Sequence, residues 1–296
     1  MRIYLAGMEN ETWHPIVQTK RVENCFVSYY YMREQADLGK SALNVVRSNV
    51  KNIIVDSGAH SFFSERYEEG LSVSNLRKKT KTKQSPEDYM ANYLKWLRQF
   101  YDMFDYFVEL DIGEIVTQKR VLEWREQIKA EKLYGKCITV NHPAVVPFED
   151  WLATVKDSES KYVAIEGERA NRERLPYNKL IEPCYLAGVK VHGFAMLKKD
   201  VLEKYPFYSV DSTSWMGGIL FGRGMAKNGK KNSFVNYNEK SNQSVSLAKH
   251  HIDVDHLYDK NKKTQYFARA MLSVEAYRTM QKHYTDLWSL RGIKWE

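Results

Sequence analysis

Acidic side chains follow three short apolar runs of the sequence. Asp56, Asp111 and Asp211 lie at or near the ends of the runs NIIVDSG from residue 52, YFVELDI from residue 106 and FYSVDST from residue 207. Two carboxylates at one site can divide the work of glycosidic-bond cleavage, because one attacks the anomeric carbon while the other protonates the leaving group. The residues therefore suggest cleavage or exchange of a glycosidic bond.

Further polar groups follow these and other apolar runs. The additional candidates for substrate binding are Ser57 and Gly58 after Asp56, Asn141 and His142 in CITVNHP, Glu166 and Gly167 in YVAIEGE, and His192 in VKVHGFAM. Each has an ordinary explanation, because an Asp after a strand is often a turn former and a histidine in an apolar run is often a core residue. Glu166 also has Arg169 nearby as a pairing partner. The repeated placement at run ends favours a shared site.

Helical patterns separate the apolar runs. They cover residues 85–104, 117–133, 148–158 and 177–188, and the first begins with Ser85 as N-cap and Pro86 in the first turn. This alternation predicts a parallel sheet covered by helices. Seven strands, with an eighth possible near GGILFGRG at 217–224, predict a (β/α)8 TIM-type barrel, whose active sites lie at the C-terminal ends of the strands. A doubly wound open sheet is the alternative, although no GxGxxG follows the first run.

Two segments interrupt this alternation. Residues 64–84 are polar and predict a long loop, while residues 216–245 are rich in Gly, Asn and Lys and predict a loop or hairpin insertion after the seventh strand. Residues 246–296 predict C-terminal helices. The sequence shows no interdomain linker, so we expect a single domain over residues 1–296.

The composition is basic, with 45 Lys and Arg against 37 Asp and Glu and a formal net charge of +8. This charge favours phosphate-bearing partners, although a soluble basic protein without such a partner has the same composition. The three cysteines, Cys25, Cys137 and Cys184, have neither disulfide-framework nor zinc-site spacing. We therefore expect no metal, no cofactor and a reducing, cytoplasmic setting. No apolar run is long enough to cross a membrane, and the first residues do not resemble a signal peptide.

Two motifs resemble those of the tRNA-guanine transglycosylase family. VDSGAHSF, from Val55, is similar to the DSGG(F/Y)Q stretch of these enzymes, and SVDSTSW, followed by GGILFGRGMAKNGKKNSFVNY, is similar to their nucleophile strand and the loop after it. Three weaker matches lie between these two motifs, in the same order as in the family: FVELDIGE, ITVNHP and YVAIEGE. The series spans roughly residues 52–237 and most resembles the short phage-type members, including those that insert 7-deazaguanines into DNA.

The resemblance implies a role for each matching residue. Asp211 would be the nucleophile, Asp56 the general acid/base, and Asp111 the reader of the purine's Watson–Crick edge with help from Asn141 and Gly167. The basic residues Arg223, Lys227, Lys230 and Lys231 would lie along the nucleic-acid path.

The chain also departs from the family. The tRNA enzymes carry a Cys/Cys/Cys/His zinc site after the nucleophile, whereas no cysteine follows Cys184 here, and DSGG becomes DSGA. We therefore expect a pentosyltransferase that replaces guanine with a preQ0-like 7-deazapurine base in DNA rather than tRNA, in the host cytoplasm if a phage encodes it. Two alternatives remain, an enzyme that hydrolyses an N-glycosidic bond and a non-catalytic nucleic-acid-binding barrel.

Overall fold

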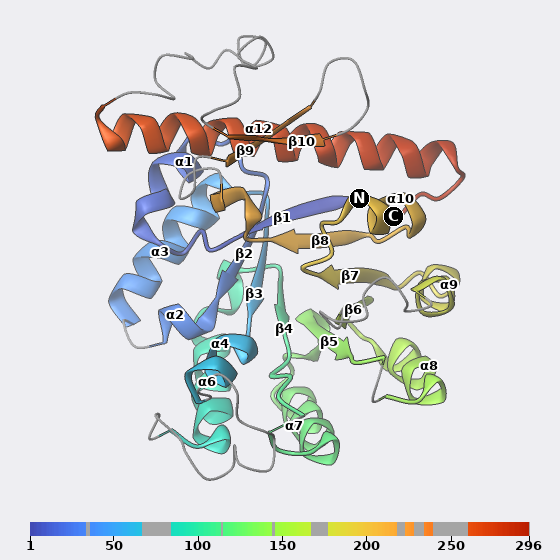
Figure 1. The fold of residues 1–296 in the computed structure, drawn as a ribbon. Helices are drawn as coiled ribbons and strands as arrows, with labels where there is room; N and C mark the ends of the chain where they lie inside the picture. The colour runs from blue at the N-terminus through green and yellow to red at the C-terminus, as the bar shows by residue number, and fades with distance from the viewer. Residues whose placement is uncertain are drawn as a thin grey trace.

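Eight parallel strands close into a barrel in the computed structural model (Figure 1). The structure describes residues 1–33, 36–66, 84–113, 115–143, 146–166, 177–217, 223–227, 234–238 and 260–295. The strands pair in sequence order, and the last pairs with the first. They are β1 Arg2–Ala6, β2 Asn24–Ser28, β3 Asn52–Asp56, β4 Tyr106–Val108, β5 Cys137–Asn141, β6 Tyr162–Glu166, β7 Lys190–Phe194 and β8 Ser209–Ser212. The predicted TIM-type barrel is confirmed.

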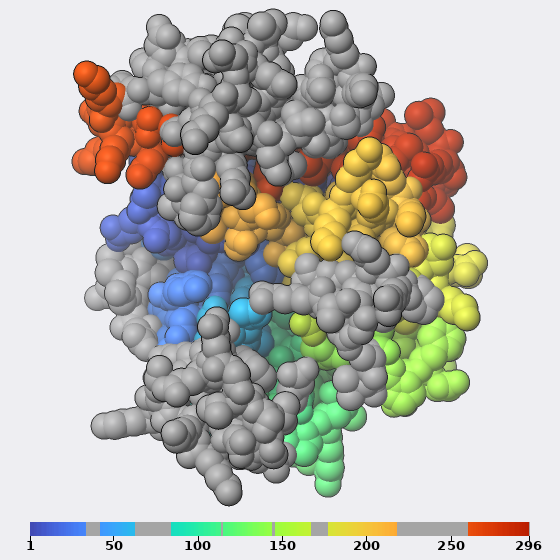
Figure 2. All heavy atoms as spheres, in the orientation of Figure 1, coloured from blue at the N-terminus to red at the C-terminus, as the bar shows by residue number. Residues whose placement is uncertain are grey.

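Helices connect the strands and surround the barrel. The α-helices are α1 His14–Gln18, α2 Tyr29–Met32, α3 Ala36–Asn49, α4 Ala59–Arg66, α6 Pro86–Gln99, α7 Gln118–Ala130, α8 Phe148–Asp157, α9 Tyr177–Leu186, α10 Lys199–Lys204 and α12 Lys262–Leu290. Short 3-10 helices are η1 Glu11–Trp13, η2 Tyr101–Met103, η3 Tyr134–Lys136 and η4 Ser214–Met216. The colours in the space-filling view run around the molecule from blue through green to yellow, as consecutive β/α units of a ring should (Figure 2).

The predicted helix starts are confirmed at two N-caps. The Ser85 hydroxyl accepts the backbone N–H of Asp88, and the Thr117 hydroxyl accepts that of Arg120. Each cap satisfies a donor that would otherwise lack a partner in the first turn, and it fixes where the helix leaves the preceding loop.

The second strand of the barrel differs from the sequence-based expectation. β2, with the sequence NCFVS, pairs with β1 and β3 and supplies the eighth strand that we expected near 217–224. In that later region, Arg223–Lys227 forms β9, which pairs antiparallel with β10 at Phe234–Asn238 outside the barrel. The insertion therefore follows the eighth strand, not the seventh. The run at β2 is short and continues directly into the aromatic residues of α2, which obscures it in the sequence.

The long helix α12 takes the place of the barrel's eighth helix and lies along β1 (Figure 1). The side-chain amide oxygen of Gln281 accepts the backbone N–H of Ile3 at 2.8 Å and the amide of Asn24 at 2.9 Å. These bonds fasten α12 to the seam where β1 meets its neighbours. No helix among the described residues combines the length and apolar composition needed to cross a membrane.

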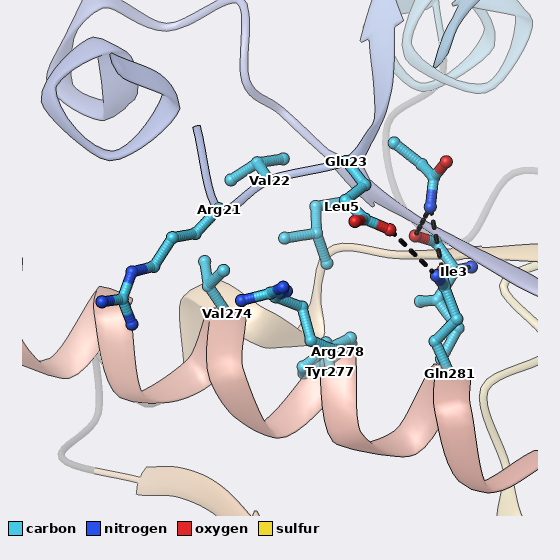
Figure 3. Close-up of a pocket in the computed structure, with 10 residues that line it drawn as sticks. Ile3, Leu5, Arg21, Val22, Glu23, Val274, Tyr277, Arg278 and Gln281 are labelled. Carbon is cyan, nitrogen blue, oxygen red and sulfur yellow. Dashed lines mark hydrogen bonds between the residues drawn. The ribbon is translucent and has the colours of Figure 1, made fainter. Parts of the chain in front are cut away.

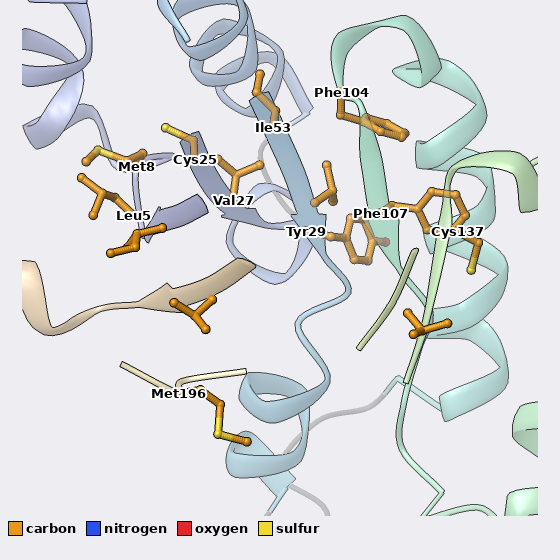
Figure 4. Close-up of a cluster of buried hydrophobic side chains, with 14 of the residues drawn as sticks. Leu5, Met8, Cys25, Val27, Tyr29, Ile53, Phe104, Phe107, Cys137 and Met196 are labelled. Carbon is orange, nitrogen blue, oxygen red and sulfur yellow. The ribbon is translucent and has the colours of Figure 1, made fainter. Parts of the chain in front are cut away.

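Apolar side chains form two layers on either side of the barrel wall. The interior layer consists of Tyr4, Ala6, Phe26, Ile54, Val108, Ile138, Val140, Tyr162, Ala164 and Tyr208. Alternate residues of the same strands, such as Cys25, Val27 and Ile53, face the helices in the outer layer (Figure 4). Strands buried on both faces explain the nearly continuous apolar runs in the sequence.

A buried ion pair fixes β4 against α7 and β5. Arg125 donates to both carboxylate oxygens of Glu109, at 2.6 and 2.7 Å, and the backbone N–H of Val140 donates to the same carboxylate at 2.6 Å. Because both of its oxygens accept hydrogen bonds, Glu109 stabilises the packing of the segment after β4 against α7 and β5, next to the polar residues at the strand ends.

Candidate functional site

The carboxyl ends of the strands bring most of the predicted polar residues to one rim. Asp56 ends β3, Glu166 ends β6 and Asp211 lies near the end of β8. His142 directly follows β5, and Asp111 comes three residues after the end of β4. Because parallel strands of a barrel end at the same rim, side chains from distant parts of the sequence meet there. This rim is the candidate site.

The Asp56–Ser57–Gly58 segment forms the turn that follows β3. The Asp56 carboxylate accepts the backbone N–H of Gly58 and, at Oδ2, the hydroxyl of Ser28 at 3.3 Å. Gly58 has a φ of +76°, and a Cβ atom there would lie 2.4 Å from the Cβ of Tyr30. The glycine is therefore required by both backbone conformation and space. The Ser57 hydroxyl is buried, without a hydrogen-bond partner among the described residues.

The environment of Asp56 favours its protonated form. Burial raises the pKa of Asp56 to about 6, and the negative charges of Asp211 and Asp111 add to the effect. Hydrogen bonds from Gly58 and Ser28 oppose the shift without cancelling it. A carboxyl group with this pKa can donate and accept a proton near neutral pH.

Asp211 is held by one of its two carboxylate oxygens. Oδ1 accepts the backbone N–H of Ala195 at 2.8 Å and lies 3.3 Å from Nε2 of His192. Within the described parts of the chain, Oδ2 has no hydrogen-bond partner, and the side chain retains 12% exposure. One oxygen is thus fixed while the other remains available to a reactant.

His192 lies inside the barrel, beneath Asp211. It is fully buried, stacks on Phe26 with ring centroids 5.5 Å apart, and has Nδ1 2.6 Å from the hydroxyl of Ser209. Ser209 also forms a short hydrogen bond with the hydroxyl of Tyr162. His192 was expected to bind substrate, but its contacts here are with Asp211 and the barrel interior.

Asp111, His142 and Glu166 form a second cluster. The two ring nitrogens of His142 lie 2.5 Å from Oδ2 of Asp111 and 2.5 Å from Oε2 of Glu166. Burial alone would lower the pKa of His142, but the hydrogen bonds and negative charges of the two carboxylates raise it to about 10. His142 is therefore an imidazolium that holds both carboxylates in place.

The same three residues are the group, within the described ranges, whose spacing could suit a metal ion. One ligand atom from each lies within 4.8 Å of the others. A metal requires a histidine nitrogen with a free lone pair. Both nitrogens of His142 are engaged with carboxylates, so a cation could bind here only in place of the His142 proton and one of these contacts.

Asn141 was predicted to bind substrate, but it lies on the other face of the barrel wall from His142. Alternation along β5 places Asn141 on the helix-facing side with Cys137, opposite to His142. Its side-chain amide is buried, and neither polar atom has a partner among the described residues.

Gly167, Lys230 and Lys231 lie outside the described residues. Arg223 and Lys227 begin and end β9, which belongs to a two-stranded sheet separate from the barrel.

One carboxyl group at the rim was missed by the sequence analysis. Glu9 follows β1 by three residues, and its Oε2 is fully buried without a hydrogen-bond partner in the described structure. Burial raises the pKa of Glu9 to about 7, and the nearby charge of Asp56 contributes to the shift. The strand-end criterion that selected the other residues would also have selected Glu9, had it been applied a few residues beyond β1.

A small open cleft lies elsewhere, between the outer side of β1 and β2 and the helix α12 (Figure 3). Its lining includes Leu5, Val22 and Val274 together with Arg21, Glu23 and Arg278. Gln281 spans its end through the hydrogen bonds that fasten α12 to β1. The cleft faces the helix side of the wall and contains no pair of converging carboxylates, so the rim is the better candidate for chemistry.

Comparisons with known proteins do not identify a family for this chain. No family model and no curated protein sequence matches this chain. Among solved structures it is similar to a mandelate racemase/muconate lactonizing protein from Herpetosiphon aurantiacus, at 9% identity and a TM-score of 0.42. The match covers 71% of this chain and 54% of that protein, so it spans about half of the other chain's length. The assignment of the barrel depends on the strand pairing described above.

Proposed function

We propose that this chain exchanges a base in a nucleic acid, replacing guanine with a 7-deazaguanine derivative, and that Asp211 is the nucleophile. The observation that carries the proposal is the asymmetric environment of Asp211. Its Oδ1 is fixed by Ala195 and His192, whereas its Oδ2 has no partner among the described residues. A carboxylate held in this way has one oriented oxygen with which to attack an anomeric carbon.

Asp56 is suited to the proton transfers of this reaction because its pKa is raised to about 6. In the first half, an oxygen of Asp211 bonds to C1′ as the C1′–N9 bond breaks. The bonding electron pair goes to N9, which takes the proton of Asp56. In the second half, N9–H of the incoming base returns a proton to Asp56 while N9 bonds to C1′. The bond from C1′ to Asp211 then breaks, its electron pair returns to the carboxylate, and both residues end as they began.

Asp111 supports recognition of a purine. Its Oδ2 is bound to His142, while Oδ1 has no partner in the described part of the chain. An ionised carboxylate accepts hydrogen bonds only, which complements the N1–H and 2-amino donors of guanine and of 7-deazaguanine. The His142 clamp would keep Asp111 oriented while bases enter and leave.

The charge distribution is compatible with a nucleic-acid substrate. The chain as a whole carries a formal charge of +8, although the rim is rich in carboxyl groups. The raised pKa values of Asp56 and Glu9 reduce the negative charge of the rim, which lessens its repulsion of phosphates. We favour DNA over tRNA because the sequence lacks the cysteines of the tRNA enzymes' zinc site. A base within a duplex would be extruded, at a cost of a few kcal/mol.

The test is to incubate the protein with radiolabelled guanine and either guanine-containing DNA or tRNA. Incorporation of the label into nucleic acid is the expected result, with DNA the better substrate. Release of guanine without incorporation would show hydrolysis instead. A mobility shift with neither reaction would show a binding protein.

The Asp211→Asn variant tests the assigned nucleophile. An amide lacks the anionic oxygen, so we expect label incorporation to fall at least about a thousandfold and the covalent intermediate to disappear, with nucleic-acid affinity retained. Asp102→Asn is the matched control, because Asp102 is exposed in η2, before β4 and away from the rim. Covalent trapping by Asp211→Asn would show that another residue attacks.

A further inference from the structure

A chain of hydrogen bonds runs through the interior of the barrel and ends at Asp211. The hydroxyl of Tyr162, on β6, forms a short hydrogen bond with the hydroxyl of Ser209, on β8. That of Ser209 lies 2.6 Å from Nδ1 of His192, on β7. Nε2 of His192 lies 3.3 Å from Oδ1 of Asp211. Tyr162, Ser209 and His192 are fully buried, so bulk water does not compete for these bonds.

The end of the chain at Asp211 determines where its hydrogens lie. Oδ1 of Asp211 also accepts the backbone N–H of Ala195 at 2.8 Å, so this oxygen acts as an acceptor. Nε2 of His192 must therefore carry the hydrogen between the two side chains. In a neutral ring Nδ1 is then an acceptor, which receives the hydroxyl hydrogen of Ser209, and Ser209 in turn accepts from Tyr162. Every hydrogen in this arrangement has an acceptor.

The opposite direction would leave a buried donor without an acceptor. An imidazolium would donate from Nδ1 to Ser209, and Ser209 would then donate to Tyr162. The Tyr162 hydroxyl would have no acceptor for its own hydrogen, because within the described structure Ser209 is its hydrogen-bond partner. A buried donor without a partner is costly, and so is a buried cation. The network therefore favours a neutral His192 with its hydrogen on Nε2.

Packing and backbone conformation direct both donors at the same oxygen of Asp211. The His192 ring stacks on Phe26, with 7° between the planes, and meets Phe194 edge to face with centroids 5.0 Å apart. Ala195, which supplies the backbone N–H, has a φ of +50°, a left-handed conformation that is unfavourable for a residue other than glycine. Strain of this kind is often retained where a backbone group has a function.

We propose that His192 is a positioning residue for the departure of Asp211 from C1′ in the second half of base exchange. Ser209 and Tyr162 act through His192, because they fix which of its nitrogens carries the hydrogen. The role in departure depends on the proposed base exchange, whereas the tautomer is a property of the folded protein and can be measured without any reaction.

The two halves of the reaction make different demands on Asp211. In the first half Oδ2 bonds to C1′, and Asp211 becomes an uncharged ester whose carbonyl oxygen is Oδ1. In the second half N9 of the incoming base bonds to C1′ as the bond from C1′ to Oδ2 breaks. The electron pair of that bond goes to the carboxylate, and the N9 proton goes to Asp56. Hydrogen bonds to Oδ1 strengthen as its negative charge returns, so they make Asp211 a better leaving group.

The first test measures the tautomer and requires no activity. Nitrogen-15 NMR of histidine-labelled protein distinguishes the two neutral tautomers and the imidazolium, and the His192 signals are those that disappear in His192→Gln. We expect the hydrogen on Nε2 in wild type at neutral pH. Ser209→Ala should move the Nδ1 signal toward that of a nitrogen without a hydrogen bond. Ser273→Ala, at a buried serine on α12, is the matched control and should leave it unchanged. A hydrogen on Nδ1 of wild-type His192 would overturn the proposal.

The second test follows the covalent complex. The protein is incubated with labelled DNA or tRNA until a complex that resists denaturant has formed, and excess guanine is then added. We expect the complex to disappear about a hundredfold more slowly in His192→Phe, which lacks the donor, than in wild type. His192→Gln should be less impaired, because it offers an amide N–H in place of Nε2–H. Ser273→Ala should behave as wild type.

The outcomes separate the inference from the proposed function. Equal rates of disappearance in wild type and His192→Phe would refute the role of His192 in departure, although the base exchange would stand. A wild type that forms no covalent complex and incorporates no label would refute the base exchange and with it this role. The NMR measurement on wild type would still decide the tautomer, and it does not depend on whether any variant folds.

Discussion

His142 is held between two carboxylates, and this determines its charge across the neutral pH range. Its ring nitrogens lie 2.5 Å from Asp111 and from Glu166, and its pKa is raised from 6.5 to about 10. A pKa raised by folding stabilises the folded state fully below the unfolded value, and the effect is lost as the pH rises through the folded value. The window for His142 therefore extends from about pH 6.5 to 10.

We expect His142→Gln to be less stable than wild type at pH 7, with a difference that shrinks as the pH approaches 10. Each pH unit of the window contributes up to about 1.4 kcal/mol. Urea unfolding at pH 6.5, 8 and 9.5 measures the trend, and His283→Gln on α12 serves as the control. Parallel curves for wild type and His142→Gln would show that the imidazolium clamp does not form.

At the scale of single elements, the turn after β3 depends on Gly58. Its φ of +76° suits glycine, and an added Cβ would collide with Tyr30 and approach the Tyr89 hydroxyl at 2.9 Å. We expect Gly58→Ala to lower the free energy of unfolding by at least about 2 kcal/mol, because backbone strain and collision add together.

Gly188→Ala separates these two costs. Gly188 also has a positive φ, +65°, but nothing lies within 4 Å of its Cβ position. This variant should lose only the conformational share, about 1 kcal/mol. Equal losses in the two variants would mean that the Tyr30 side moves aside at no cost and that space at Gly58 is unimportant.

The elements themselves were predictable to different degrees. Helices with clear caps, such as those that begin after Ser85 and Thr117, could be located from local sequence because the cap chemistry is local. β2 could not be located, since its five residues become a strand through pairing with β1 and β3.

The residues of the candidate site were likewise predictable only where a local sequence pattern identifies them. Asp56, Asp111, His142, Glu166 and Asp211 were found because strand ends meet at one rim. The role of His192 beneath Asp211 depends on contacts made across the barrel interior, which no local pattern contains.

At the scale of the whole molecule, the basic charge and the acidic rim have to be reconciled. Lys230 and Lys231 lie outside the described residues, but the sequence places them soon after the strand that carries Asp211. We expect them to contact backbone phosphates and to contribute no base readout. Each phosphate contact on duplex DNA contributes about 0.9 to the log–log salt slope, so replacing both with Ala should reduce the slope by about 1.8.

Binding of several DNA sequences across a salt series measures this effect. Sequence preference should stay unchanged while affinity falls for all sequences. Lys51 and Lys161 are the control pair, because they are exposed and directly precede β3 and β6 at the opposite end of the barrel. An unchanged slope, or an altered sequence preference, would show that Lys230 and Lys231 serve another purpose.

The closure of the barrel by β1 and β8, and the attachment of α12 to β1, have a consequence for how the protein is made. Ile3 and Gln281 are joined by a hydrogen bond although they lie 278 positions apart in the sequence. One edge of β1 stays unpaired until β8 has been synthesised, which exposes that edge to aggregation during synthesis. Ring closure also brings Asp211 toward Asp56 only when β8 pairs with β1. These carboxyl groups therefore repel one another only when the barrel closes, and by then the packing of the other strands can offset the repulsion.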